Sequence, residues 1–308
     1  MPSPNYTPRP ELDALVKDFD VTGNSQGYVG LSIMPLINTA VSSGEFPKID
    51  ANELMKRADT KRASRGSYNR IDTGFAQDNF VCTERGLEGA VDDSLAKIYA
   101  SYLDAEVEVS NVVLGNLLLD QEIRIRDVVY AQTSNAVATP WSTYATATPR
   151  DNINDASETI RKRTGVKPNS IQMTLNKFRD ILKCAELLDI AKFTGNILAM
   201  GIDAQKAVVS AFIGIPNIIL AEAVENTSDE GQDFVGADIW VDTSAFLFVA
   251  GGTLQGGPKF GVTMDWTGDS AMNESYYEDQ TRSTILRTRH WRDEKVQLTT
   301  AGWLLSSL

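Results

Sequence analysis

The longest helical pattern in the sequence lies between residues 104 and 132. Apolar side chains recur there at helical spacing, at Val107, Val109, Val112, Val113, Leu117, Ile123 and Val128. Asp104 is placed as an N-cap, and Glu106 and Glu108 follow in the first turn, where the helix dipole favours acidic groups. The pattern predicts about 28 helical residues, or about 42 Å. The sequence offers no second helix of similar length, so a helix that crosses a sheet is favoured over a bundle.

Two shorter helices are predicted after this segment, at 154–163 and 176–188. Asp155 and Glu158 form a cap-like pair near the start of the first, and Gly165 would end it.

Strands are predicted where short runs of β-forming residues stand between turn residues. Such runs occur at 170–174, 218–221, 238–241 and 245–250, and 284–305 predicts a strand pair. The most apolar stretch, 207–224, is broken by Gly214 and Pro216 into a buried helix, a turn and a buried strand. It falls short of the ~20 apolar residues of a membrane span. Helices and strands together predict an α+β fold.

Two segments show neither the helical spacing of apolar residues nor a strand-like run of β-forming residues. Residues 84–93, ERGLEGAVDD, are rich in glycine and acids and are interpreted as a turn before a short helix at 94–103. Residues 1–43 begin with four prolines within ten residues, which oppose regular structure. They are interpreted as an arm whose apolar stretch 31–36 could dock on another surface.

Residues 44–81 differ from the rest of the chain in charge. Between Lys48 and Arg70 there are seven basic and three acidic residues, a net of +4 in a chain of net −12. The low apolar content favours a hairpin or loop that projects from the body. It is either a solvated charged loop or a segment that lies on an acidic neighbour. Stacking on single-stranded nucleic acid is a weaker alternative, because only Tyr68 and Phe75 are aromatic here.

Acidic residues are concentrated in a second segment. Residues 221–281 contain twelve acids and one base, Lys259, and 282–295 then contain five bases against two acids. An isolated enzyme has little need of such separation. Opposite charges on different surfaces can set the register of copies that pack side by side.

Residues typical of an active or metal site are scarce. The 308 residues include two cysteines and one histidine, too few for a disulfide framework or a His-based triad. Motifs for phosphate binding, serine hydrolysis and zinc are absent from the sequence. There is no secretory signal, and the acidity argues against coating of nucleic acid. We therefore predict a cytosolic assembly subunit without catalytic residues, metal or cofactor. An enzyme with perturbed carboxylates in a pocket is an alternative.

The order of elements resembles that of tailed-bacteriophage major capsid proteins of the Hong Kong 97-type fold. The resemblance begins at Glu84–Tyr130, where a glycine-containing turn, an acidic pair, a short helix and a long helix with Glu122 and Arg124 follow one another. It continues through the turn 164–169 and the strand 171–173 to the closing segment 296–303. The resemblance covers roughly residues 30–305, and it depends on the order of the elements rather than on any single motif.

The resemblance implies four parts. They are an N-terminal arm (1–43), an extended β-hairpin loop (44–81), a peripheral domain with a long spine helix (82–152, helix at about 104–132, completed by strands in 282–308) and an axial domain (153–281). The basic window would then be the extended loop.

The implied function is a structural subunit that assembles as hexamers and pentamers into an icosahedral shell around double-stranded DNA. The implied partners are other copies of the chain, a portal and a decoration protein. The chain has no room for a cleavable scaffolding region before the arm, so we expect a separate scaffolding protein and no N-terminal processing. The shell would assemble in the host cytoplasm, without a membrane, and become the virion capsid. An encapsulin-like shell around cargo enzyme is the alternative with the same fold.

In the family, the extended loop lies over a neighbouring subunit. The inter-subunit candidates in this loop are Lys56, Arg57, Lys61, Arg62 and Arg65. Their expected acidic partners on the neighbour are Asp92, Asp93, Glu106 and Glu108. Each exposed pair contributes only ~0–1 kcal/mol, so the effect depends on many copies. Some members of the family cross-link a lysine of the extended loop to an asparagine on a neighbouring subunit. Lys56 and Lys61 are candidates for such a cross-link by their position in the loop alone.

Overall fold

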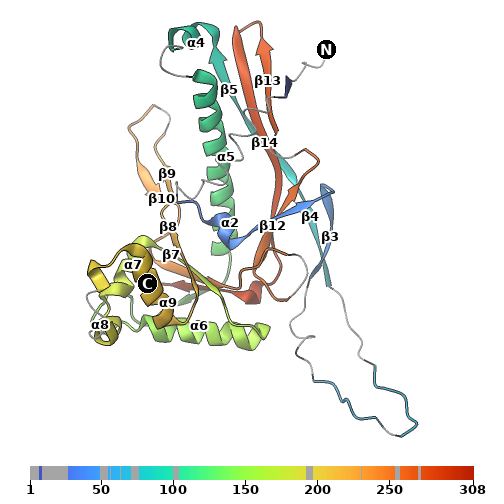
Figure 1. Cartoon of the computed structure of the whole chain (residues 1–308), viewed down its shortest axis with the longest axis vertical. Coiled ribbons are helices and arrows are strands. Elements are labelled where there is room, and N and C mark those ends of the chain that lie inside the picture. Colours follow the sequence, from blue (N-terminus) through green and yellow to red (C-terminus); the bar gives the residue numbers. More distant parts are fainter. Residues whose placement is uncertain are drawn as a thin grey trace.

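The computed structural model describes residues 7–8, 27–48, 55, 57–62, 64–70, 76–99, 104–191, 197–229, 231–253, 257–269 and 272–308. Within them, two large sheets are connected by one long helix, and a hairpin projects from the body (Figure 1). Most of the predicted arm, Lys56 and the end of the predicted helix 94–103 lie outside the described residues.

The predicted spine helix is confirmed as α5 (Ala105–Tyr130). Asp104 caps it by accepting the backbone N–H groups of Glu106 and Val107. The buried face differs from the predicted stripe: Val112 is 55% exposed, whereas Gln121 and Glu122 are buried. Polar side chains can be buried there because neighbouring elements supply their hydrogen-bond partners.

The first large sheet, called the long sheet below, runs beside α5. Its strands are, in order, β1 (Thr7–Pro8), β13 (Met272–Glu278), β14 (Ser283–Val296), β12 (Gly261–Trp266) and β2 (Leu36–Thr39), and β5 (Thr83–Asp92) pairs with β14. β12 and β2 are parallel, and the other pairs are antiparallel.

The interpretation of residues 84–93 as a turn is wrong, because 84–92 belong to β5, which pairs with β14 along its whole length, and Asp93 begins the next helix. The glycines have a packing role instead. A Cβ on Gly89 would lie 2.3 Å from Val109 Cγ1 of α5, so the helix can cross the strand only where the side chain is absent. Glycine in a turn and glycine under a helix look alike in a single sequence.

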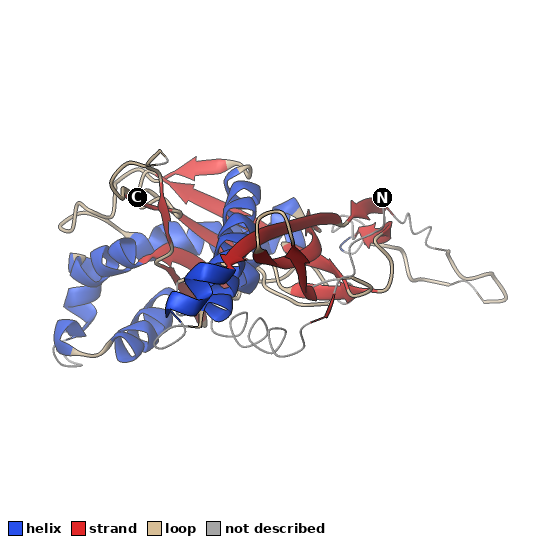
Figure 2. Ribbon diagram, turned by 90° about the horizontal axis from the view of Figure 1, so that it is seen from above, coloured by secondary structure: helices blue, strands red, loops and turns tan. Residues whose placement is uncertain are grey.

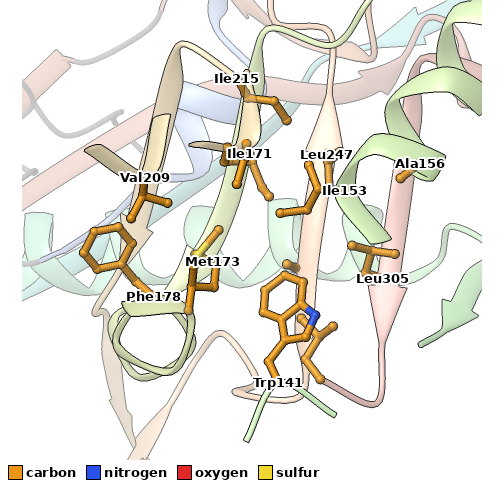
Figure 3. Packing of buried hydrophobic residues seen from close by; sticks show 14 of the residues in the cluster. Trp141, Ile153, Ala156, Ile171, Met173, Phe178, Val209, Ile215, Leu247 and Leu305 are labelled. Atoms are coloured by element: carbon orange, nitrogen blue, oxygen red, sulfur yellow. The ribbon is translucent and has the colours of Figure 1, made fainter. Parts of the chain in front are cut away.

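The second large sheet, called the five-stranded sheet, has the order β6 (Ser134–Ala136), β15 (Gly302–Ser306), β11 (Ser244–Phe248), β7 (Ser170–Thr174) and β8 (Asn217–Ala221). The helices α6 (Pro149–Thr164), α7 (Leu175–Lys183), α8 (Ala185–Ala191) and α9 (Ile202–Ile213) gather at this end of the molecule (Figure 2). Together they enclose a core that includes Trp141, Ile171, Phe178 and Leu247 (Figure 3).

Helix α6 begins at Pro149 rather than at Asn154, because proline suits the first helical turn. The supposed capping pair, Asp155 and Glu158, therefore lies inside the helix. Gly165 ends the helix as predicted, with φ 76° in the left-handed region.

Three further elements differ from their predictions. The helix predicted at 176–188 is two helices, because Cys184 between α7 and α8 is extended. The predicted strand 238–241 is β10 (Gly236–Asp238), which pairs with β9 (Val224–Asn226). The strand pair predicted within 284–305 is not a pair: β14 belongs to the long sheet and β15 to the five-stranded sheet.

The sheets also divide the chain differently from the four implied parts. β12 and β13 fall within the implied axial segment, 153–281, yet they belong to the long sheet. β15 was assigned to the peripheral part and lies in the five-stranded sheet. The acidic residues of 221–281 are therefore distributed over both sheets. Strand partners are chosen by tertiary contacts, which the local pattern does not specify.

The apolar stretch 31–36, proposed to dock on another surface, contacts its own chain. It forms α2 (Gly30–Ile33), and Ile33 and Met34 are buried in a cluster with Ile125 and Val129 of α5.

The projecting hairpin has a packed base. β3 (Ser43–Lys48) and β4 (Ala76–Val81) are antiparallel. Phe46 and Phe80 of these strands are buried against Val262 and Met264 of β12. The base thereby fixes the hairpin on the long sheet, and the basic residues extend away from the body (Figure 1).

Candidate functional site

The basic side chains beyond the hairpin base are exposed. The exposed side chains are those of Arg57, Lys61, Arg62 and Arg65. The Arg62 guanidinium lies 4.4 Å from the centre of the Tyr68 ring and donates to the Gly66 carbonyl. These local contacts hold the Arg62 side chain against the projecting segment.

The four acidic candidates lie at the opposite end of the molecule, where α4 (Asp93–Tyr99) and the start of α5 meet the tip of the long sheet (Figure 1). Asp92 accepts a backbone N–H of α4 at 2.7 Å. Asp93 accepts the Tyr277 hydroxyl at 2.8 Å. Glu106 is half-buried and Glu108 is exposed.

Among the described residues, the loop bases and the four acidic candidates are thus not brought together within one subunit. The projecting hairpin and the acidic end point away from each other along the long axis (Figure 1). An ion pair between them requires a second copy of the chain.

A network of ion pairs on the long sheet was not foreseen from the sequence. Arg289 of β14 contacts Asp269 at 2.8 Å, Glu274 at 2.9 Å and Glu84 at 3.2 Å. Arg287 pairs with Glu274 and with Glu88 of β5. The signal was the two-residue spacing of Arg287 and Arg289, which places both on one face of a strand. Much of the basic charge of 282–295 is therefore neutralised within the chain.

A second charged group lies between α5 and β14. Arg124 pairs with Glu294 at 3.0 Å. His290 is 3% exposed near these residues. Burial lowers its pKa to about 2, with a further contribution from Arg292, Arg124 and Arg85. The imidazole is therefore uncharged at neutral pH, with a packing role in this region.

A buried carboxylate joins three elements at the middle of the molecule. Glu122 of α5 is 3% exposed. It accepts the backbone N–H groups of Val29 at 2.9 Å and Gly30 at 2.7 Å, and the Trp240 Nε1–H at 2.7 Å. Burial raises the pKa of Glu122, and the three hydrogen bonds oppose that shift. Glu122 thereby attaches the chain before the long sheet to the spine helix.

The described residues contain no group of three or more His, Cys, Asp and Glu side chains arranged to hold a metal ion. Cys82 and Cys184 are free and buried, and burial raises the pKa of Cys184 to about 11. Among the described helices, none combines the length and apolarity needed to cross a membrane.

A spine helix beside a long sheet, an extended β-hairpin and a helix-covered second sheet define an α+β capsid fold of the Hong Kong 97 type. No protein-family model matches the chain. Over nearly its whole length it is similar to the major capsid protein of Burkholderia phage BcepMu, with 21% identity over 311 residues and 96% of each chain covered.

Solved structures confirm the fold. A phage-related protein of Bordetella bronchiseptica RB50 matches with a TM-score of 0.72, at 16% identity over 98% of each chain. A putative prophage capsid protein from E. coli CFT073 has a TM-score of 0.57, at 9% identity over 98% of this chain and 99% of that one. The virus-like particle of Pyrococcus furiosus has a TM-score of 0.56, at 9% identity over 94% and 98%.

Proposed function

We propose that this chain is the major capsid subunit of a tailed bacteriophage. It assembles as hexamers and pentamers into an icosahedral shell that encloses double-stranded DNA. One observation carries the proposal: the projecting basic hairpin and the acidic end lie at opposite ends of one subunit, so each is available to a neighbour. The similarity to a major capsid protein along 96% of the chain supports the same function.

In this proposal the hairpin of one subunit lies over the next. Arg57, Lys61, Arg62 and Arg65, with Lys56, pair with the neighbour's Asp92, Asp93, Glu106 and Glu108. The contact joins different surfaces of identical subunits, and such heterologous contacts form rings when the rotation between neighbours closes. Each exposed pair contributes only ~0–1 kcal/mol, so the stabilisation comes from repetition around each ring.

The net charge of −12 suits a container for DNA. Surplus negative charge lets packed DNA be confined without strong binding, because affinity for the phosphate backbone depends on cationic contacts. We further propose a separate scaffolding protein, a portal and a decoration protein as partners, with assembly in the host cytoplasm and the virion as the final location.

An encapsulin-like shell around cargo enzyme is not favoured. The sequence relative is itself a phage capsid protein. The contents of purified particles, DNA or enzyme, distinguish the two functions.

The test is reversal of the loop charge, Lys61→Glu with Arg62→Glu and Arg65→Glu, in the full chain, expressed under the conditions in which the wild-type chain assembles. We expect the yield of shells, measured by gradient sedimentation and electron microscopy, to fall sharply. The matched control reverses three bases on the helices of the other sheet: Arg179→Glu, Lys183→Glu and Lys206→Glu.

Two results would count against the proposal. An unchanged shell yield in the loop variant would show that the ion pairs are not needed. A wild-type chain that never exceeds a small oligomer would refute the shell function itself.

A further inference from the structure

A second hairpin, β9–β10, exposes several apolar side chains. Phe234 is 73% exposed, Val235 is 55% exposed and Val224 is 49% exposed. Single exposed apolar residues are common, but a group of them on one projecting element is typical of an interaction site. An exposed aromatic ring is the kind of side chain that anchors protein interfaces.

Hydrogen bonds join the two sides of the described part of this hairpin tip, 227–229 and 231–235. Asn226 Oδ1 accepts the backbone N–H groups of Ser228 and Val235, each at 3.1 Å. The Thr227 N–H donates to the Val235 carbonyl at 2.9 Å. At the base, Glu225 accepts from Arg126 of α5 at 3.5 Å. A loop that is already ordered loses little conformational entropy when it binds.

The hairpin is also strongly acidic. Residues 222–242 contain seven acidic residues and no lysine or arginine. Asp233 directly precedes Phe234 in the sequence, and Asp229 lies in the same tip between β9 and β10. A partner surface for this hairpin should therefore combine a site for an aromatic ring with positive charge.

Such a surface lies at the end of α6. A cavity of about 210 Å³ is lined by residues that include Arg163, Trp303, Thr133 and Asn135. The Arg163 guanidinium lies 5.0 Å from the centre of the Trp303 ring. A cavity of about 150 Å³ is sufficient for benzene. A phenyl ring entering here would contact the indole and the guanidinium, both of which favour aromatic partners.

The surroundings of this cavity carry the complementary charge. Residues 158–167 contain four bases, Arg161, Lys162, Arg163 and Lys167, against one acid, Glu158. Lys162 and Lys167 are exposed, and Val166 is 41% exposed beside them. This basic and partly apolar patch stands out in a chain of net charge −12.

We propose that Phe234 on the β9–β10 hairpin of one copy enters the Arg163–Trp303 cavity of the next copy. Asp229 and Asp233 then face Lys162 and Lys167. The contact cannot form within one subunit, because the β9–β10 hairpin lies beside α5, whereas α6 lies across the end of α5 that is remote from α4 (Figure 1). Hairpin and cavity are different surfaces, so repetition of the contact forms a ring of subunits when the rotation between neighbours closes. The inference rests on the proposed shell function and specifies one contact between neighbouring subunits of that shell.

Disulfide trapping tests the contact in the full chain. Phe234→Cys combined with Asn135→Cys should give a ladder of covalent oligomers on a non-reducing gel after mild oxidation of the purified full chain, whether or not it has assembled into shells. The native thiols of Cys82 and Cys184 are buried and contribute little background. In the matched control, Leu198→Cys replaces Phe234→Cys, since Leu198 is apolar and 52% exposed on another element. The control should give no ladder.

A charge exchange adds an independent readout. Asp233→Lys should lower the cross-linked fraction severalfold when it is added to the trapping pair. Lys167→Asp should restore that fraction in the combined variant, because the pair is then reversed rather than removed.

The outcomes separate this inference from the shell function. Shells of normal size without a ladder would overturn the contact and leave the shell function intact. A ladder without shells would support the contact and contradict the shell function. Absence of both would refute both.

Discussion

Glu122→Ala is expected to destabilise the subunit strongly, because one carboxylate serves three buried donors. Removal of the carboxylate leaves the N–H groups of Val29 and Gly30 and the Trp240 indole N–H without an acceptor. A buried donor without a partner costs about 1–3 kcal/mol.

The lower end of that range applies here, since the variant also removes the desolvation cost that raises the pKa of Glu122. Three donors at about 1 kcal/mol each give a loss of about 3 kcal/mol in the free energy of unfolding at neutral pH.

The raised pKa adds a dependence on pH with a definite sign. The folded protein holds the Glu122 proton to a higher pH than the unfolded chain, whose carboxyl has its ordinary pKa of 4.5. The stability that this group supplies is complete below about that pH and decreases as the pH rises through the raised value. The advantage of the wild type over Glu122→Ala should therefore shrink as the pH is raised from 4.5.

Urea unfolding of the dissociated subunit, followed by tryptophan fluorescence, measures both effects. Glu108→Ala is the matched control, because it removes an exposed acid in the first turn of the same helix. Its expected cost is at most about 1 kcal/mol, from lost interaction with the helix dipole. If Glu122→Ala and Glu108→Ala cost the same, Glu122 does not hold the three elements together.

Two further predictions concern packing and titration. Gly89→Val should destabilise the subunit by about 1–3 kcal/mol, because its Cβ would lie 2.3 Å from Val109 Cγ1. Gly115→Ala, with open space around the new Cβ, should stabilise α5 by about 0.5–1 kcal/mol; equal effects on the unfolding midpoint would contradict the helix–strand contact. The single histidine, His290, should show no protonation by NMR between pH 8 and 4, because its folded pKa is about 2. Its contribution to stability should be lost as the pH falls from its ordinary 6.5 toward that value, and an NMR midpoint near 6 would refute the buried placement.

Several elements could be predicted from local sequence because their determinants are local. Asp104 begins α5 by accepting N–H groups two and three residues later. Gly165 ends α6 because glycine adopts the left-handed backbone at little cost. The run 170–174 forms a fully buried strand because all its side chains tolerate burial between neighbours.

The candidate site was predictable only in part. Exposure of the loop bases follows from their charge and the low apolar content around them. The internal pairing of Arg287 and Arg289, and the hairpin with Phe234, could not be foreseen. Both depend on strands that find partners far along the chain, and the acidic composition alone does not show which acids are already neutralised.

By itself, the sequence determined the long helix with its cap, the α+β character and the separation of charge along the chain. Each of these depends on residues within a few positions of one another. Tertiary contacts were needed to show that residues 84–92 form a strand, that β14 and β15 belong to different sheets, and that Glu122 joins three elements. These outcomes depend on contacts between residues far apart in sequence, such as Arg124 with Glu294, 170 positions away. A local pattern of polar and apolar residues records that a side chain is buried, but not which partner buries it.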